Sequence, residues 1–201
     1  MTEQIIKTFN KWGTEGITIE DAGLRDYINL SSRIVPRTNG RHMGVRFSKS
    51  KVFIVERLIN KIMGAGHKSK KHFRSSGHTT GKAQNASEIV EKAFQKIEER
   101  TKKNPIEVFV KALENAAPRE EVVTIEYGGA RYPKAVECAP IRRIDYALRI
   151  MVQGSYHTCF NKKKSMVDAL VDEIMAAYLL SNNSISVSKK LELERQADSS
   201  R

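Results

Sequence analysis

Features that define many specialised chemistries are scarce in this sequence. It contains two cysteines, Cys138 and Cys159, which are too few for a disulfide framework or a cysteine-built zinc site. Aromatic residues make up 7% of the chain, and no apolar run approaches the roughly 18 residues of a membrane span. The N-terminal residues lack the basic start and apolar core of a secretory signal. We therefore expect a cytoplasmic protein with no membrane partner and no structural metal.

Acidic residues are scarce in those parts of the chain where basic residues gather. The 201 residues include 35 Lys and Arg against 23 Asp and Glu, which gives a net charge of +12. Residues 31–82 hold thirteen basic residues and one acid, Glu56, so this segment carries the whole excess. Residues 131–164 add eight basic residues against two acids. Such an excess indicates a polyanionic partner, with nucleic acid favoured over an anionic membrane. A solvated tail is the weaker alternative, because these segments flank predicted helices.

Apolar residues recur at helical spacing through much of the chain after residue 51. Asn104 is suited to cap one helix and Pro105 to form its first turn. Gly64 is expected to end the first helix, and Gly154 to close or bend the fourth. The predicted helices lie at residues 52–63, 86–103, 105–117, 140–153 and 166–177, with a short helical patch at 191–195.

Between the third and fourth helices the pattern changes to that of a β-hairpin. Residues 122–127 are rich in β-branched and aromatic side chains, Gly128-Gly129 is a turn signal, and residues 131–138 can return as the partner strand. The predicted fold class is therefore mainly α, a single bundle of about six helices with one protruding β-hairpin at residues 122–138.

Two parts of the chain differ in character. Residues 1–50 are interpreted as an N-terminal extension and basic loop, and residues 51–201 as a helical RNA-binding domain. Within the second part, residues 67–82 are rich in Ser, Gly, Lys and His and have almost nothing to bury. They are predicted to form a mobile basic loop.

Candidate catalytic groups form no recognisable arrangement. His67, His72 and His78 share one loop, but their spacing fits no compact metal-ligand pattern, and neither Cys nor carboxylate lies nearby to complete a shell. Cys159 and His157 stand two positions apart on a helix and point in different directions. We predict a protein that is not an enzyme, with no catalytic residue, no metal and no cofactor. An RNA-processing enzyme that uses the loop histidines is an alternative.

Features of nucleic-acid binding are stronger. Arg142, Tyr146, Arg149 and Gln153 fall at i, i+4, i+7 and i+11 of the fourth helix, so they form a polar stripe opposite its apolar face. Arginine binds phosphate oxygens with two donors, and tyrosine stacks on a base or a ribose. An ordinary exposed helix face is the alternative.

The predicted hairpin carries similar groups around its turn. Tyr127, Arg131, Tyr132 and Lys134 supply aromatic and basic side chains, and Gly128-Gly129 permits close approach of the backbone to a ligand. A fold gains little from such a tip, because a lone two-stranded ribbon contributes little core. An RNA neighbour would explain it.

The remaining predicted contacts are basic side chains in loops and on helices, including Arg57 and Lys61, which are placed on the polar face of the first helix. The residues predicted to bind RNA are Arg37, Arg41, Arg46, Arg57, Lys61, Lys68, Lys70, Lys71, Arg74, Lys82, Arg119, Arg131, Lys134, Arg142, Arg143, Tyr146, Arg149, Lys162, Lys163, Lys164, Lys189, Lys190, Arg195 and Arg201.

The order and spacing of several short motifs resemble the S-seven family of small-subunit ribosomal proteins, in its archaeal and eukaryotic branch. The resemblance runs from about Asp26 to Arg201. The pieces that carry it are residues 52–58 (VFIVERL), Gly81-Lys82 followed by Ile89-Val90 and Ala93, Asn104-Pro105, residues 117–120 (APRE), residues 140–143 (PIRR) with Ala147, and residues 188–195 (SKKLELER).

This resemblance implies a six-helix domain with a β-hairpin that binds the 3′ major domain of small-subunit ribosomal RNA and nucleates the subunit head. It also implies neighbouring ribosomal proteins as partners. The hairpin tip is expected near the exit-site transfer RNA and the messenger RNA exit path. The tip residues are Tyr127, Gly128, Gly129, Arg131 and Tyr132.

One departure from the family pattern concerns the loop between the first two long helices. The family usually has a short Gly-Lys-Lys or Gly-Lys-Arg loop, whereas here the loop stretches from Gly64 to Lys82 and Ala83 replaces the second basic residue. The alternative function is a helical DNA-architectural or transcription-related protein, which would dimerise and bind duplex DNA with comparable affinity.

Overall fold

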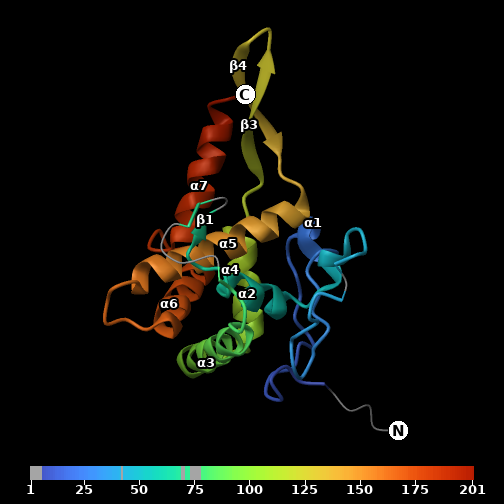
Figure 1. Cartoon of the computed structure of the whole chain (residues 1–201), viewed down its shortest axis with the longest axis vertical. Coiled ribbons are helices and arrows are strands. Elements are labelled where there is room, and N and C mark those ends of the chain that lie inside the picture. The colour runs from blue at the N-terminus through green and yellow to red at the C-terminus, as the bar shows by residue number, and fades with distance from the viewer. Residues whose placement is uncertain (1–5, 42, 69–70, 73–77) are drawn as a thin grey trace.

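The computed structural model describes residues 6–41, 43–68, 71–72 and 78–201. It is mainly helical with one long β-hairpin, as predicted (Figure 1). In chain order the elements are α1 (Ala22–Arg25), the 3-10 helix η1 (Ser48–Lys51), α2 (Ile54–Ile62), β1 (His67–Lys68), β2 (Lys71–His72), α3 (Ala83–Thr101), α4 (Pro105–Ala116), β3 (Glu120–Tyr127), β4 (Ala130–Glu137), α5 (Pro140–Cys159), α6 (Met166–Tyr178) and α7 (Ile185–Asp198).

Local signals set the ends of several helices. The Asn104 side chain accepts a hydrogen bond from the backbone N–H of Ile106, and Pro105 forms the first turn of α4, as predicted. Ser165 and Ser184 cap α6 and α7 in the same way. These caps satisfy backbone donors that lack partners within the first helical turn.

The core is built around α6, which packs against α3, α4 and α5. The rings of Phe94 on α3 and Phe109 on α4 lie 5.9 Å apart at their centroids. Leu148 on α5 and Ile174 on α6 are fully buried in the same cluster. The helices therefore share one apolar interior.

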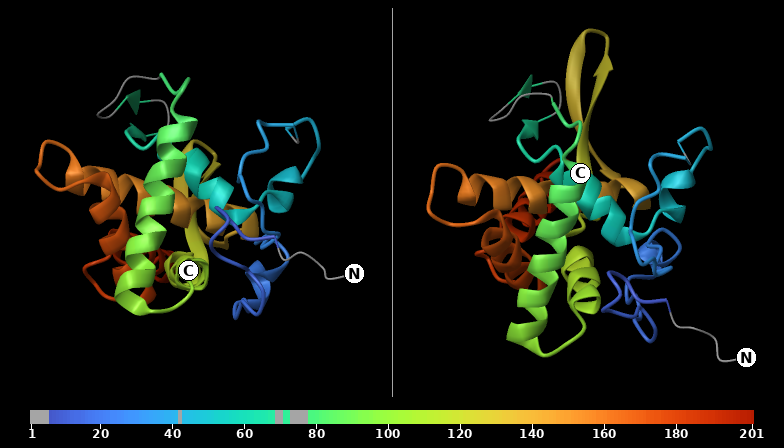
Figure 2. Two further views of the ribbon diagram at one scale, coloured as in Figure 1. Left: turned by 90° about the horizontal axis from the view of Figure 1, so that it is seen from below. Right: turned by 60° about the horizontal axis from the view of Figure 1, so that its bottom comes forward.

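The N-terminal segment packs onto this bundle. Trp12 is almost fully buried, its ring meets Phe94 edge to face at 5.9 Å, and its Nε1–H donates to Glu98 at 2.9 Å. The Asn104 side chain donates to the carbonyl of Gly13. Figure 2 shows this segment and the following loop beside the helices, next to the N-terminal half of α5.

Strands β3 and β4 form the predicted hairpin, which projects from the bundle (Figure 1). Its base is tied down, because the N–H of Cys138 donates to the carbonyl of Arg119 at 2.9 Å. Arg201, beyond the end of α7, binds both oxygens of Glu120 at 2.6 and 2.7 Å. Tyr127, at the tip, is 81% exposed. The hairpin is therefore anchored at one end and solvated at the other.

Three local predictions are wrong. Helix α5 continues through Gly154 to Cys159, and a Cβ atom at Gly154 would lie 3.1 Å from Ile185, so this glycine permits close packing of α7 on α5. Helix α7 is longer than the predicted patch at 191–195. Strands β1 and β2 pair where a loop without regular structure was expected.

Candidate nucleic-acid interface

Helix α5 has an apolar face and a polar face on opposite sides, as predicted. Leu148 and Met151 are fully buried, whereas Arg149 is exposed. The guanidinium of Arg149 lies 5.2 Å from the ring centroid of Tyr146, in a cation–π contact. Gln153 donates to the backbone carbonyl of His67 at 2.7 Å, which joins α5 to β1. The stripe is thus held in place by contacts along and beyond the helix.

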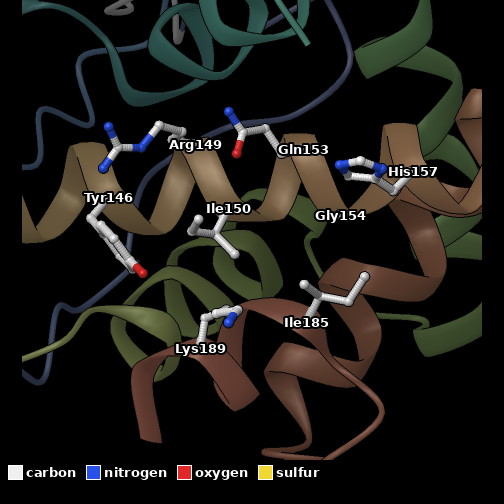
Figure 3. A pocket seen from close by; sticks show the side chains of 8 residues that line it. All are labelled: Tyr146, Arg149, Ile150, Gln153, Gly154, His157, Ile185 and Lys189. Atoms are coloured by element: carbon white, nitrogen blue, oxygen red, sulfur yellow. The ribbon is translucent and has the colours of Figure 1, made fainter. Parts of the chain in front are cut away.

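A hollow of about 450 Å³ lies between α5 and α7 (Figure 3). Tyr146, Arg149, Gln153 and His157 line it from α5, and Lys189 lines it from α7. A tyrosine hydroxyl is protonated at neutral pH, and burial raises the pKa of Tyr146 further, so this group can donate a hydrogen bond. The hollow presents cations and hydrogen-bond donors on both sides.

Two further hollows continue this one across α2. One, of about 230 Å³, is lined by Lys61 on α2 and by Arg149 and Gln153 on α5. The next, of about 440 Å³, is lined by Lys61, Lys49 and Phe47. Neighbouring hollows share lining residues, Arg149 and Gln153 between the first two and Asn60 and Lys61 between the last two. We call the following polar residues that line the three hollows the basic groove: Lys49, Asn60, Lys61, Tyr146, Arg149, Gln153 and Lys189.

The basic side chains of the groove differ in whether they form an ion pair with an acidic residue of the protein. Lys49 pairs with Asp145, and Lys189 pairs with Glu192. Among the described residues, Lys61 and Arg149 form no ion pair. Burial lowers the pKa of Lys61 despite the attraction of Asp145. A partly desolvated cation of this kind gains from an anionic ligand.

Two arginines predicted to bind RNA lie inside the fold, so their predicted exposure is wrong. Arg57 is 4% exposed, donates to the carbonyl of Tyr27 and pairs with Asp145 at 3.3 Å. Arg143 donates to the carbonyl of Pro118 and pairs with Asp21 at 2.6 Å. Their guanidinium groups join distant parts of the chain, and we leave both out of the proposed RNA surface.

Other predicted RNA-binding residues divide into two groups on the surface. Five form ion pairs with acids: Arg131 with Glu126, Arg142 with Glu121, Lys164 with Asp172, Lys189 with Glu192 and Arg201 with Glu120. Without an ion pair, among the described residues, are Arg37, Arg41, Arg46, Lys82, Arg119, Lys134, Lys162, Lys163, Lys190 and Arg195.

Besides Lys82, four predicted residues belong to the lengthened loop. Lys70 and Arg74 lie outside the described residues. Lys68 is in β1 and Lys71 in β2, where their backbones pair with each other. For Lys68 and Lys71 the structure therefore describes the course of the backbone only.

Sequence reasoning missed Lys49 and Asn60 of the basic groove, and Phe47, which lines the same hollow. Lys49 and Phe47 lie in and next to η1, where no periodic pattern shows which side chains face α5. The available signal was the density of positive charge in residues 31–82. Charge density locates a binding segment, but it does not select residues within it.

The described residues show no membrane-spanning helix, no metal-ligating cluster and no activated thiol. No described helix is long and apolar enough to cross a bilayer, and no three metal-ligating side chains cluster among the described residues. Burial raises the pKa of Cys138 to about 11, so this thiol stays protonated at neutral pH and is a poor nucleophile.

Comparison with known proteins gives consistent matches over nearly the whole chain. Residues 24–201 match the family described as Ribosomal protein S7p/S5e. Two proteins named small ribosomal subunit protein uS7 are similar to it. The one from Nanoarchaeum equitans is 53% identical over 196 residues, covering 98% of this chain and 99% of the relative. The one from Archaeoglobus fulgidus is 46% identical over 200 residues, covering 100% and 97%.

Proposed function

Because this chain belongs to the ribosomal protein S7p/S5e family, we propose that it binds the 3′ major domain of small-subunit ribosomal RNA and nucleates folding of the subunit head. As a member of this family it is a structural ribosomal protein of the small subunit, which acts in translation in the cytoplasm, and it is not an enzyme. The observation that carries the RNA-binding proposal is the basic groove, with Lys61 and Arg149 at its centre.

The groove acts by neutralising phosphates and holding one arrangement of RNA. Its residues come from four elements, η1, α2, α5 and α7, so it can meet more than one RNA segment. Arg149 offers a planar set of donors that fits phosphate oxygens, and Tyr146 offers a ring beside it. The rigid core beneath fixes these groups relative to one another.

Replacing Arg149 by Ala should weaken binding to a 3′ major domain transcript by about 1–3 kcal/mol, because a charge-assisted contact is lost. The melting temperature should stay nearly unchanged, since Arg149 lies on the surface. Binding is measured by filter retention at fixed salt.

Arg100→Ala is the matched control. Arg100 is an exposed arginine on α3 that pairs with Asp172 at 2.9 Å and does not line the groove. Equal losses of affinity for both variants would contradict a role for the groove. The same losses with a transcript of another rRNA domain would contradict selectivity for the head.

The hairpin is assigned a separate role, toward the exit-site transfer RNA and the messenger RNA. Shortening Tyr127–Tyr132 to a plain two-residue turn should spare folding and head assembly, because the side chains of Tyr127 and Tyr132 are exposed and the base is held by Arg119 and Arg201. The loss should appear in exit-site occupancy or in reading-frame maintenance, measured on purified ribosomes.

Replacing Val123 by Thr, on the exposed part of the hairpin stem, serves as its control. Ribosomes that fail to assemble with the shortened protein would contradict this division of roles. So would assembled ribosomes that equal the control in both assays.

A further inference from the structure

The hollow between η1, α2 and α5 has apolar walls as well as charged groups. It measures about 440 Å³, and its apolar lining residues include Met43 and Phe47. Its polar lining residues include Asn60, Lys61 and Asp145. An apolar lining with a few polar groups is typical of a small-ligand site.

Phe47 is placed unusually for an aromatic residue. It is 73% exposed, although rings of this kind are normally buried. Its backbone adopts φ 56° and ψ 13°, a left-handed conformation that is rare for bulky residues. The carbonyl of Phe47 accepts a hydrogen bond from the Ser50 hydroxyl at 2.9 Å, which holds this turn closed. The ring is therefore presented to solvent by a fixed turn.

Positive charge surrounds the exposed ring. The guanidinium of Arg46 lies 5.7 Å from its centroid, and Lys49 and Lys61 line the same hollow. Asp145 is held ionised, since hydrogen bonding and attraction from Lys49, Lys61 and Arg57 outweigh the effect of burial and lower its pKa. A phosphate is thus favoured at the rim, beside the cations, and a hydrogen-bond donor is favoured near Asp145.

We propose that this hollow binds a single unpaired RNA base, stacked on Phe47, with its exocyclic amino group directed to Asn60 and Asp145. The inference rests on the proposed function, because it assigns one subsite within the RNA surface. Unpaired bases that stack on aromatic side chains are the usual targets of sequence-specific RNA recognition. The adjacent phosphate is bound by Lys61 and Arg46.

The test uses the full chain and a 3′ major domain transcript, with Phe47→Leu as the main variant. Leucine removes the ring but keeps an apolar side chain at an exposed position. Affinity should fall about 5- to 150-fold, the usual effect of losing one stacked base. The salt dependence of binding should not change, because no phosphate contact is lost. Base-modifying probes should show one adenine, cytosine or guanine that the wild type protects and Phe47→Leu does not.

Two further variants make the test specific. Phe47→Trp should keep the affinity of the wild type, and RNA should quench its fluorescence, because Trp12 is buried and the new ring is not. Val45→Ala, an exposed apolar residue of the same loop that does not line the hollow, should bind like the wild type.

Three results would overturn the subsite: wild-type affinity for Phe47→Leu, no quenching of Phe47→Trp in the complex, or protection of a uridine alone. Each of these leaves wild-type RNA binding intact and the proposed function standing. Failure of the wild-type protein to bind the transcript would instead contradict the proposed function itself.

Discussion

Glu173→Ala should lower the free energy of unfolding by about 3–5 kcal/mol, because several buried donors would lose their acceptor. Glu173 lies on α6, is 6% exposed and accepts hydrogen bonds from four groups at the start of α7. These groups are the Ser184 hydroxyl, the backbone N–H of Ile185, and the backbone N–H and hydroxyl of Ser186. Denaturant unfolding followed by circular dichroism measures the loss.

The neighbouring residue supplies the control. Asp172 is partly exposed and pairs with Arg100 at 2.9 Å and with Lys164 at 2.6 Å. Surface ion pairs contribute little, so Asp172→Ala should change stability by at most about 1 kcal/mol. A Glu173→Ala protein as stable as Asp172→Ala would show that the α6–α7 contact does not depend on this carboxylate.

Most of the fold was predicted from local signals, each of which lies within a single segment of the chain. The cap at Asn104 and the proline after it fixed the start of α4, and apolar periodicity fixed the buried faces of α3, α5 and α6. The turn glycines at 128–129 placed the hairpin. These features depend on residues close in sequence, so they could be identified without knowing the tertiary structure.

Features that depend on distant partners could not be predicted. Arg57 looked like a polar-face residue, but α2 packs against both α3 and α5, and Asp145 supplies a carboxylate 88 positions away. Gly154 was expected to close or bend the helix, whereas its missing side chain leaves room for Ile185. Helix α7 is sparse in apolar residues, and Glu173 of another helix satisfies its first turn.

The sequence predicted the type of candidate site but not which residues form it. Net charge and the stripe on α5 indicated a nucleic-acid surface that includes Arg149. Neither indicated that Lys61 would lie across a groove from Arg149, or that a loop would bring Phe47 to the same depression. Those placements come from the packing of α2 on α5, which joins segments about 90 residues apart.

The affinity for ribosomal RNA should fall steeply with salt if the basic groove and the other unpaired basic side chains on the surface bind phosphates. Neutralising about six phosphates gives a slope of log K against log salt near −4 to −5. Between 50 and 200 mM salt this amounts to a loss of about 300- to 1000-fold in affinity. Lys61→Gln and Arg149→Gln should each reduce the magnitude of the slope by about 1, since each removes one phosphate contact.

Lys96→Gln is the matched control, because Lys96 on α3 pairs with Asp168 at 2.6 Å and lies outside the groove. Its slope should equal that of the wild type, since an intramolecular ion pair releases no counterion from RNA. A wild-type slope near zero would contradict electrostatic binding altogether. Slopes of Lys61→Gln and Arg149→Gln that match Lys96→Gln would place the phosphate contacts elsewhere on the basic surface.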